Sequence, residues 1–160
     1  MKFKQYIYQI NRLFAWTNPF EYKDIAYQTI ESINAIGSGR IYGRGFLNSI
    51  QKNVIPEVHN DMIFSILCDE FGIIGAYALI ILYSILIFRI LYLSYRHSDM
   101  YSRFILFGIA IHISMQVICN IAVATNMIPN TGVTLPFISY GGSSLLTSFI
   151  CIGLLLNISS

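Results

Sequence analysis

The stretch IIGAYALIILYSILIFRILYL, residues 73–93, decides the fold class, since it runs for 21 residues with a single charged side chain. A helix of about 20 apolar residues crosses the ~30 Å hydrocarbon core of a bilayer. The one charge, Arg89, lies near the end of the run, from which its guanidinium reaches the membrane surface. Residues 104–124 and 136–157 form two further runs of this kind. The sequence therefore predicts an all-α integral membrane protein with three transmembrane helices.

The composition supports this class. Of the 160 residues, 55% are hydrophobic and 11% are charged, and the mean hydropathy is +0.60, values typical of membrane proteins. The net charge of +2 and the lack of a lysine or arginine cluster argue against nucleic-acid binding. Cys68, Cys119 and Cys151 lie within apolar runs without a CxxC pair, so they predict neither a disulfide framework nor a zinc site.

Residues 1–61 are more polar and are predicted to form a separate region with amphipathic helices, ahead of the three-span region at residues 62–160. In residues 1–16, apolar side chains recur at helical spacing opposite lysine, glutamine and arginine. This pattern predicts either an amphipathic helix at a membrane interface or the end of a longer helix, and periodicity does not separate the two. Residues 25–36 are predicted to form a second helix, and the glycine-rich loop GSGRIYGRG follows at 37–45.

The charges of the two short loops predict how the chain is oriented. The loop SYRHSDMYSR, residues 94–103, carries Arg96 and Arg103, whereas the loop TNMIPNTGVTL, residues 125–135, carries no charge. Short loops rich in lysine and arginine stay on the cytoplasmic side of the membrane. We therefore expect residues 1–61 to be extracytoplasmic and the C-terminus to be cytoplasmic.

The segment PEVHND, residues 56–61, places Glu57, His59 and Asp61 just before the first apolar helix. A continuous helix over residues 62–95 would place Asp61 about 18 Å before the first span along the helix axis, above the outer membrane surface. A carboxylate that faces a polar reactant there can act as a general base. The alternative is a helix start, with a residue of this segment as the N-cap, and spacing alone favours that alternative.

Asp69 and Glu70 form a second acidic pair, at the start of the first span. On the same continuous helix Glu70 would lie opposite Asp61, so we do not expect the two to act as a carboxylate pair. Ionisable groups at such a position face protein or water rather than lipid. We therefore predict an interior structural contact, or a cap to another loop, in preference to a catalytic role.

Polar and small residues mark one face of the second span. Gly108, His112, Gln116 and Asn120 recur at intervals of four and so share a side of the helix. Such residues on a spanning helix face neighbouring helices, to which they can hydrogen-bond. Helix packing is the favoured interpretation, and the polar wall of a substrate cavity is the alternative.

Two loops contain residues suited to binding an anion. In LPFISYGGSS, residues 135–144, Pro136 and two glycines are predicted to break the third span and expose amides and hydroxyls. In GSGRIYGRG there is neither a GxGxxG pattern after a strand nor a GK[ST] sequence, which excludes the two common nucleotide loops. Arg40 and Arg44 could still hold a phosphate, and a flexible turn with solvated arginines is an equally good interpretation.

The segments AIGSGRIYGRGFLNSIQK, PEVHNDMIFSILCDEFGIIGA and IPNTGVTLPFISYGGSSLL together resemble the SEDS family of bacterial cell-wall polymerases. The resemblance covers residues 8–159 in the family's order and spacing, and NSIQK is closer to the division-type FtsW branch than to the elongation-type RodA branch. It implies the last three helices of a ten-helix bundle in the bacterial cytoplasmic (inner) membrane, preceded by a long extracytoplasmic helical loop.

The family's activity is implied with the fold. SEDS proteins polymerise lipid II, an undecaprenyl-diphosphate-linked disaccharide peptide, into the glycan strands that cell division and cell shape require. They work within the membrane lipid beside a class B penicillin-binding protein transpeptidase and other division proteins. The resemblance implies no nucleic-acid partner.

The resemblance also assigns residues. The family's essential carboxylate belongs to its PExHxDFIF motif and corresponds here to Asp61, the implied catalytic base, with Glu57 and His59 at the other polar positions. Asn60 and Met62 stand where the family usually has Thr and Phe. The implied substrate-binding candidates are Glu57, His59, Arg40, Arg44, Lys52, Ser139, Tyr140, Gly141, Gly142, Ser143 and Ser144, and the cavity-lining candidates are His112, Gln116 and Asn120. A divalent cation, Mg²⁺ or Mn²⁺, could share the binding of the diphosphate, although the sequence shows no defined metal site.

The sequence predicts three spans, whereas proteins of the family have ten. Three functions therefore have to be considered. The first is the C-terminal catalytic portion of an FtsW-type glycosyltransferase, active within a complete ten-span protein. The second is a catalytically incompetent remnant or a scaffold that binds a division transpeptidase. The third is a transporter of a lipid-linked precursor, suggested by the polar residues within spanning helices.

Overall fold

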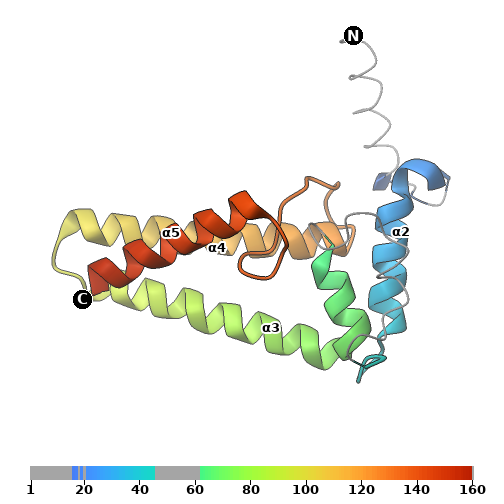
Figure 1. Cartoon of the computed structure of the whole chain (residues 1–160), viewed down its shortest axis with the longest axis horizontal. Helices are drawn as coiled ribbons and strands as arrows, with labels where there is room; N and C mark the ends of the chain where they lie inside the picture. Colours follow the sequence, from blue (N-terminus) through green and yellow to red (C-terminus); the bar gives the residue numbers. More distant parts are fainter. Residues whose placement is uncertain (1–15, 18, 20, 46–61, 160) are drawn as a thin grey trace, which may run out of the picture.

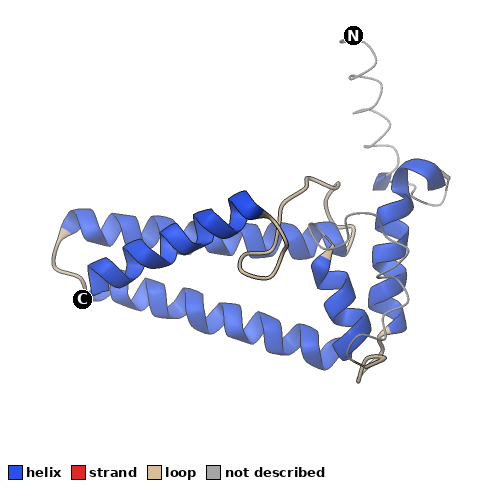
Figure 2. Cartoon of the chain, viewed as in Figure 1, coloured by secondary structure: helices blue, strands red, loops and turns tan. Residues whose placement is uncertain are grey.

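The computed structural model describes residues 16, 17, 19, 21–45 and 62–159. Its helices are α2 (Lys23–Ser38), α3 (Ile63–Arg96), α4 (Met100–Ala124) and α5 (Gly142–Ser159), joined as shown in Figure 1. The described residues contain no strand (Figure 2). The all-α prediction is confirmed, and the helix expected at residues 25–36 is present as α2.

The three helices α3, α4 and α5 are long and apolar enough to cross a membrane, which makes the chain a multi-pass membrane protein. α4 has 25 residues and α5 has 18, which correspond to about 37 Å and 27 Å of helix. α5 begins at Gly142, six residues later than the apolar run that starts at residue 136, because the turn around Pro136 is not helical.

α3 is not the continuous helix on which two of the geometric expectations depend. Its backbone leaves the helical region at Gly72, where φ is 66° and ψ is −162°. The short helix before Gly72 turns away from the rest of α3 and runs beside α2 (Figure 1). The expected 18 Å offset of the 56–61 segment and the expected opposite facing of Glu70 and Asp61 both assumed an unbroken helix, and the break at Gly72 contradicts that assumption. Residues 56–61 themselves lie outside the described residues.

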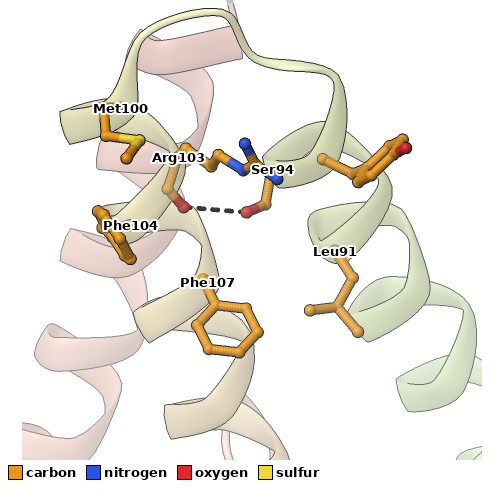
Figure 3. Close-up of a pocket in the computed structure, with 7 residues that line it drawn as sticks. Leu91, Ser94, Met100, Arg103, Phe104 and Phe107 are labelled. Atoms are coloured by element: carbon orange, nitrogen blue, oxygen red, sulfur yellow. Dashed lines mark hydrogen bonds between the residues drawn. The ribbon is translucent and has the colours of Figure 1, made fainter.

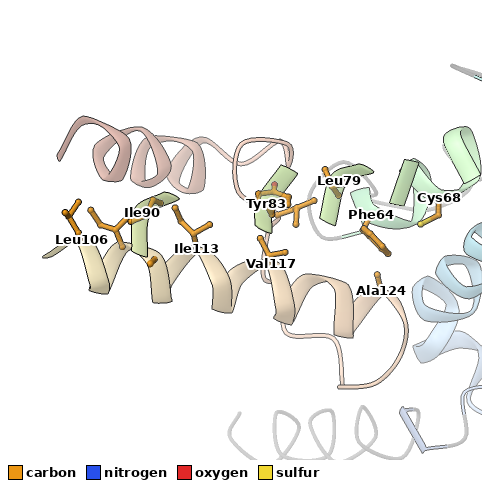
Figure 4. Close-up of a cluster of buried hydrophobic side chains, with 12 residues drawn as sticks. Phe64, Cys68, Leu79, Tyr83, Ile90, Leu106, Ile113, Val117 and Ala124 are labelled. Carbon is orange, nitrogen blue, oxygen red and sulfur yellow. The ribbon is translucent and has the colours of Figure 1, made fainter. Parts of the chain in front are cut away.

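The core lies between α3 and α4 (Figure 4). Leu79, Tyr83 and Ile90 of α3 face Ile113 and Val117 of α4, and each is less than 8% exposed. Large apolar side chains elsewhere on these helices and on α5 are exposed, for example Leu82 and Phe149. An apolar exposed surface on helices of this length is expected where lipid or further helices surround them.

α2 lies across one end of the α3–α4 pair, opposite the loop that carries Arg96 and Asp99 (Figure 1). The hydroxyl of Ser32, fully buried on α2, donates to the carbonyl of Ala124 at the end of α4, at 2.8 Å, and is also hydrogen-bonded to Ser65 of α3. The segment before α2 reaches the same end, since the indole nitrogen of Trp16 donates to the carbonyl of Asn126 at 3.0 Å.

Candidate functional site

Four of the predicted site residues, Lys52, Glu57, His59 and Asp61, lie outside the residues that the structure describes. The described chain resumes at Met62, which is 2% exposed and packs with Ile66 against Val123. The residue bonded to Asp61 is therefore buried at the end of α4 next to α2. The break at Gly72 brings it there, because a straight α3 would carry Met62 about 15 Å away along its own axis.

The glycine-rich loop is built into this break. In an unbroken helix the amides of Ile73 and Ile74 would donate to the carbonyls four residues earlier, those of Asp69 and Glu70. Here these two carbonyls accept instead from the amides of the loop, Arg44 at 2.9 Å and Gly45 at 3.0 Å.

The two displaced amides of α3 are satisfied by the same loop. Ile73 donates to the carbonyl of Arg40 at 3.0 Å, and Ile74 to that of Ile41 at 3.4 Å. We call residues 38–45 the glycine clasp. The clasp thus provides new partners for the donors and for the acceptors of two interrupted helical hydrogen bonds. These four backbone groups of α3 are all paired with the clasp, which lowers the free-energy cost of breaking the helix in a buried position.

Glycine is required in the clasp and at the break because the backbone of the clasp packs directly against the backbone of α3. A Cβ at Gly39 would overlap the carbonyl oxygen of Cys68, and one at Gly43 would overlap that of Glu70. A Cβ at Gly72 would in turn overlap the carbonyl oxygen of Ile41. Gly43 and Gly72 also have φ of 75° and 66°, which side chains with a Cβ rarely adopt.

An ion pair fastens the side chains across the same contact. The carboxylate of Asp69 is completely buried, lies 3.3 Å from Nε of Arg44, and accepts a hydrogen bond from the hydroxyl of Ser38. A buried carboxylate is stable only with such partners. The prediction that Asp69 makes a structural contact with another loop is confirmed, and this use of Arg44 excludes a flexible turn with both arginines solvated.

Glu70, next to Asp69, is also buried, at 7% exposure. Its backbone carbonyl accepts a hydrogen bond from the amide of Gly45 in the clasp, but its side-chain Oε1 has no hydrogen-bond partner among the described residues. The two neighbouring carboxylates therefore differ in one respect that experiments can use: Asp69 is tied to the clasp through its side chain, and Glu70 only through its backbone.

The guanidinium of Arg40 has no ion-pair partner among the described residues. It is exposed, with φ of 48°, and borders an open hollow of ≈ 540 Å³ that is lined by the clasp itself from Ser38 to Arg44. The structure thus separates the two arginines that the sequence treats alike. Arg44 is committed to Asp69, and Arg40 is the better placed of the two to meet an anion from solution.

The SYGGSS segment lies at a different depth. The hydroxyl of Tyr83 on α3 donates to the carbonyl of Pro136, and Tyr83 is 11 residues, about 16 Å, beyond Gly72 along the span. The turn before α5 therefore lies beside the middle of the part of α3 that follows Gly72. Non-helical backbone at membrane depth is tolerated where it is buried in protein or lines a water-filled cavity.

Within this segment some side chains are used internally and others are not. Ser139 is 3% exposed and accepts from the amide of Leu135 at 2.7 Å, and Ser144 accepts from the hydroxyl of Thr134 at 2.7 Å. Tyr140 is 83% exposed. Gly141 precedes α5, and Gly142 and Ser143 form its first turn, in which backbone amides point away from the helix. The predicted break of the third span at Pro136 and the two glycines is confirmed.

The polar residues that recur along one face of α4 differ in how deeply they are buried. Asn120 is completely buried and its amide donates to the carbonyl of Val133 at 2.8 Å, so it holds the loop that leads to α5. For Asn120 the favoured interpretation, a packing contact with a neighbouring part of the protein, is therefore confirmed. Gln116 is half-buried and His112 is exposed, which leaves these two turned toward whatever surrounds α4.

A groove of ≈ 440 Å³ lies at the opposite end of the molecule, between the last turn of α3 and the first turns of α4 (Figure 3). Leu91, Phe104 and Phe107 form its apolar part, and the hydroxyl of Ser94 donates across it to the carbonyl of Arg103 at 2.9 Å. Its position, at the end that carries the arginine loop, separates this groove from Met62 and from the clasp.

Sequence reasoning missed the residue on which this site depends. Gly72 was treated as an ordinary helix residue, and Ser32 was not considered. A glycine two residues after an acidic pair, at the start of an apolar run, was the available signal for the break. The partner of the break, 30 residues earlier, had no local signal.

Fold and site define a multi-pass membrane protein whose first span is bent at Gly72 and held there by a glycine-rich loop. The family model of the FtsW, RodA and SpoVE cell cycle proteins matches residues 2–160, so the chain belongs to this family. The resemblance deduced from the three motifs is confirmed.

Curated relatives agree with the family model. The chain is 42% identical over 154 residues to stage V sporulation protein E of Bacillus subtilis, a match that covers 95% of this chain and 42% of the relative. It is 41% identical over 157 residues to a protein of Coxiella burnetii named probable peptidoglycan glycosyltransferase FtsW, with 95% and 42% covered. The chain thus spans less than half the length of the curated relatives it matches.

Two solved structures share the fold. A chain from a peptidoglycan synthase complex, described as coordinating polymerization and crosslinking, is 30% identical with a TM-score of 0.75, over 95% of this chain and 41% of that one. A mutant of the rod shape determining protein RodA from Thermus thermophilus is 37% identical with a TM-score of 0.60, over 63% of this chain and 34% of that one.

Proposed function

We propose that the chain is the catalytic C-terminal part of a peptidoglycan glycosyltransferase that polymerises lipid II into glycan strands for cell division. The observation that carries this proposal is the match to proteins named peptidoglycan glycosyltransferase FtsW, at about 40% identity over nearly the whole chain. The FtsW relatives favour the division role over the elongation role, in agreement with NSIQK at residues 48–52.

The orientation follows from the charges and from the place of α2. We propose that the loop carrying Arg96 and Arg103 is cytoplasmic, that residues 1–61 are extracytoplasmic, and that the C-terminus is cytoplasmic. The contacts of Ser32 on α2 with Ala124 and of Trp16 with Asn126 support this, because they hold α2 and Trp16 at the end opposite the arginines.

In the reaction, a sugar hydroxyl attacks the anomeric carbon of a sugar linked to polyprenyl diphosphate, and the diphosphate leaves. Asp61 would take the proton from the attacking hydroxyl. It directly precedes Met62, and the burial of Met62 at the end of α4 supports a reaction at the outer membrane surface. Glu57 and His59 would orient the acceptor.

The leaving diphosphate needs cationic or amide donors. Arg40, exposed on the clasp, is the best supported of the candidates, and Lys52 is a further one. The first turn of α5, at Gly142 and Ser143, offers backbone amides at the membrane depth where a polyprenyl carrier lies. Arg44 is no longer a candidate for binding the diphosphate, because its guanidinium is paired with Asp69.

The partners are proposed by analogy with the same relatives. The solved complex whose description couples polymerization to crosslinking supports a transpeptidase partner of the class B penicillin-binding type, together with other division proteins. No group of three or more metal-ligating side chains lies within the described residues, so participation of Mg²⁺ or Mn²⁺ remains a prediction from the sequence.

The test is a polymerisation assay on the polypeptide as the cell produces it, purified with its transpeptidase partner and given fluorescent lipid II. Glycan strands resolved on a gel are the expected product. Absence of strands, with lipid II instead moved across the vesicle membrane, would favour a transporter, and absence of both would favour a scaffold.

A further inference from the structure

The bend in α3 is held by hydrogen bonds that compete with a straight helix. Asp69 and Glu70 give their carbonyls to the amides of Arg44 and Gly45, although the amides of Ile73 and Ile74 could bind the same carbonyls. If the clasp left, these helical pairs could re-form with the same number of backbone bonds on α3. The bent and straight forms of α3 are thus two alternatives between which the clasp decides.

The direction of the short helix decides where Met62 lies. In the bent form this helix packs on α2 through Ser65 and Ser32, and Met62 reaches Val123. In the straight form, ten residues of helix would carry Met62 about 15 Å outward from Gly72, beyond reach of α4. A carboxylate bonded to Met62 would move with it, and misplacement of a reacting group by as little as 1 Å can cost about 100-fold in rate.

We propose that the glycine clasp is a positioning element for the catalytic carboxylate: by holding α3 bent at Gly72, it keeps the start of α3 over the end of α4. Arg44, Asp69 and Gly43 are positioning residues and do not touch the substrate. This inference rests on the proposed function for its effect on catalysis, but its structural part, the bend, is measurable without activity.

A purely structural role would make a different prediction. If the clasp only stabilised the fold, its weakening would lower the amount of folded protein and leave the folded fraction with normal turnover. A positioning role lowers kcat in the folded fraction, leaves KM for lipid II little changed, and separates Met62 from Val123.

The matched pair of variants is Asp69→Asn and Glu70→Gln, two neighbouring buried carboxylates that each lose one charge. Only the side chain of Asp69 reaches Arg44 and Ser38. Arg44→Ala, at a half-exposed side chain, weakens the same ion pair without touching the core, and Arg44→Lys restores the charge. These milder changes keep the test informative if a glycine variant does not fold.

Two readouts are taken on each variant in the membrane-embedded polypeptide. The first is the yield of disulfide between cysteines placed at Met62 and Val123, in a chain whose native cysteines are replaced by alanine. The second is kcat and KM for lipid II polymerisation.

We expect Asp69→Asn and Arg44→Ala to lower both the disulfide yield and kcat about tenfold or more, Arg44→Lys to recover part of both, and Glu70→Gln to leave both near the parent values. Unchanged disulfide yield and kcat in Asp69→Asn and Arg44→Ala would overturn the proposal, as would equal losses in Glu70→Gln. If the parent makes no glycan but the disulfide yields follow this order, the clasp stands and the proposed function fails.

Discussion

The hydroxyl of Ser32 lies 2.8 Å from the carbonyl oxygen of Ala124, and this hydrogen bond joins α2 to the end of α4 across 92 positions of sequence. The same hydroxyl is hydrogen-bonded to Ser65 in the short helix of α3. One fully buried side chain thus connects α2, the short helix of α3 and the end of α4.

Ser32→Ala should therefore lower the free energy of unfolding by about 1–2 kcal/mol, because it leaves buried groups on two other helices without their partner. Thermal unfolding in detergent measures this. Ser84→Ala is the control, since among the described residues the hydroxyl of Ser84 bonds only to the carbonyl of Ile80 in its own helix, and its loss should be near neutral. A Ser32→Ala protein as stable as Ser84→Ala would contradict the connection.

Gly43→Ala should destabilise the clasp by several kcal/mol. It adds a Cβ that overlaps the carbonyl of Glu70, at a φ of 75° that alone costs about 1–2 kcal/mol. Gly37→Ala is the matched control in α2, because its Cβ meets no atom within 4 Å and replaces glycine in a helix, where alanine gains about 0.5–1 kcal/mol. Chemical denaturation of both variants checks the prediction, and similar effects in the two would argue against the packed clasp.

Asn120→Ala should loosen the approach to α5. The variant leaves the carbonyl of Val133 without its side-chain donor, at a cost of about 1–2 kcal/mol. Hydrogen exchange in the segment 128–141 is the measurement, and faster exchange is expected. His112→Ala, at an exposed position on the same face of α4, should leave the exchange unchanged; a reversal of the two results would refute the role given to Asn120.

Asp99 should make the start of α4 sensitive to acid. Its carboxylate accepts hydrogen bonds from the amide of Ser102 at 3.0 Å and from the hydroxyl of Ser102 at 2.7 Å, which lower the pKa of Asp99. A lowered pKa gives stability that is complete above the ordinary value of 3.8 and is lost as the pH falls below it. The difference in melting temperature between the parent and Asp99→Ala should shrink from pH 7 to pH 3, and a constant or growing difference would contradict this cap.

Much of the fold could be predicted from local signals. Apolar runs of about 20 residues predict spanning helices independently of their neighbours. Pro136 and the glycines that follow it indicated that the helix of the third span begins late, at Gly142. Asp69 could be recognised as structural because a carboxylate at the edge of a span needs a protein partner.

The bend at Gly72 could not be predicted in the same way. A single glycine is tolerated within a helix, and the residues that follow Gly72 are as apolar as the rest of the span. What selects the bend is competition for the carbonyls of Asp69 and Glu70 by the amides of Arg44 and Gly45, each 25 positions earlier in the sequence. Such non-local pairing produces no periodic pattern in the sequence. For the same reason, only the structure shows that Arg44 pairs with Asp69 whereas Arg40 is exposed.

The central claim, that Asp61 is the base in lipid II polymerisation, is tested most directly by comparing Asp61→Asn with Asp99→Asn in the purified, partner-bound polypeptide. Both variants exchange one carboxylate for an amide, but Asp99 caps α4 at the opposite end of the bundle. The rate of glycan strand formation should fall at least about 100-fold in Asp61→Asn and remain near the parent value in Asp99→Asn. Strand formation at the parent rate in Asp61→Asn would contradict the account.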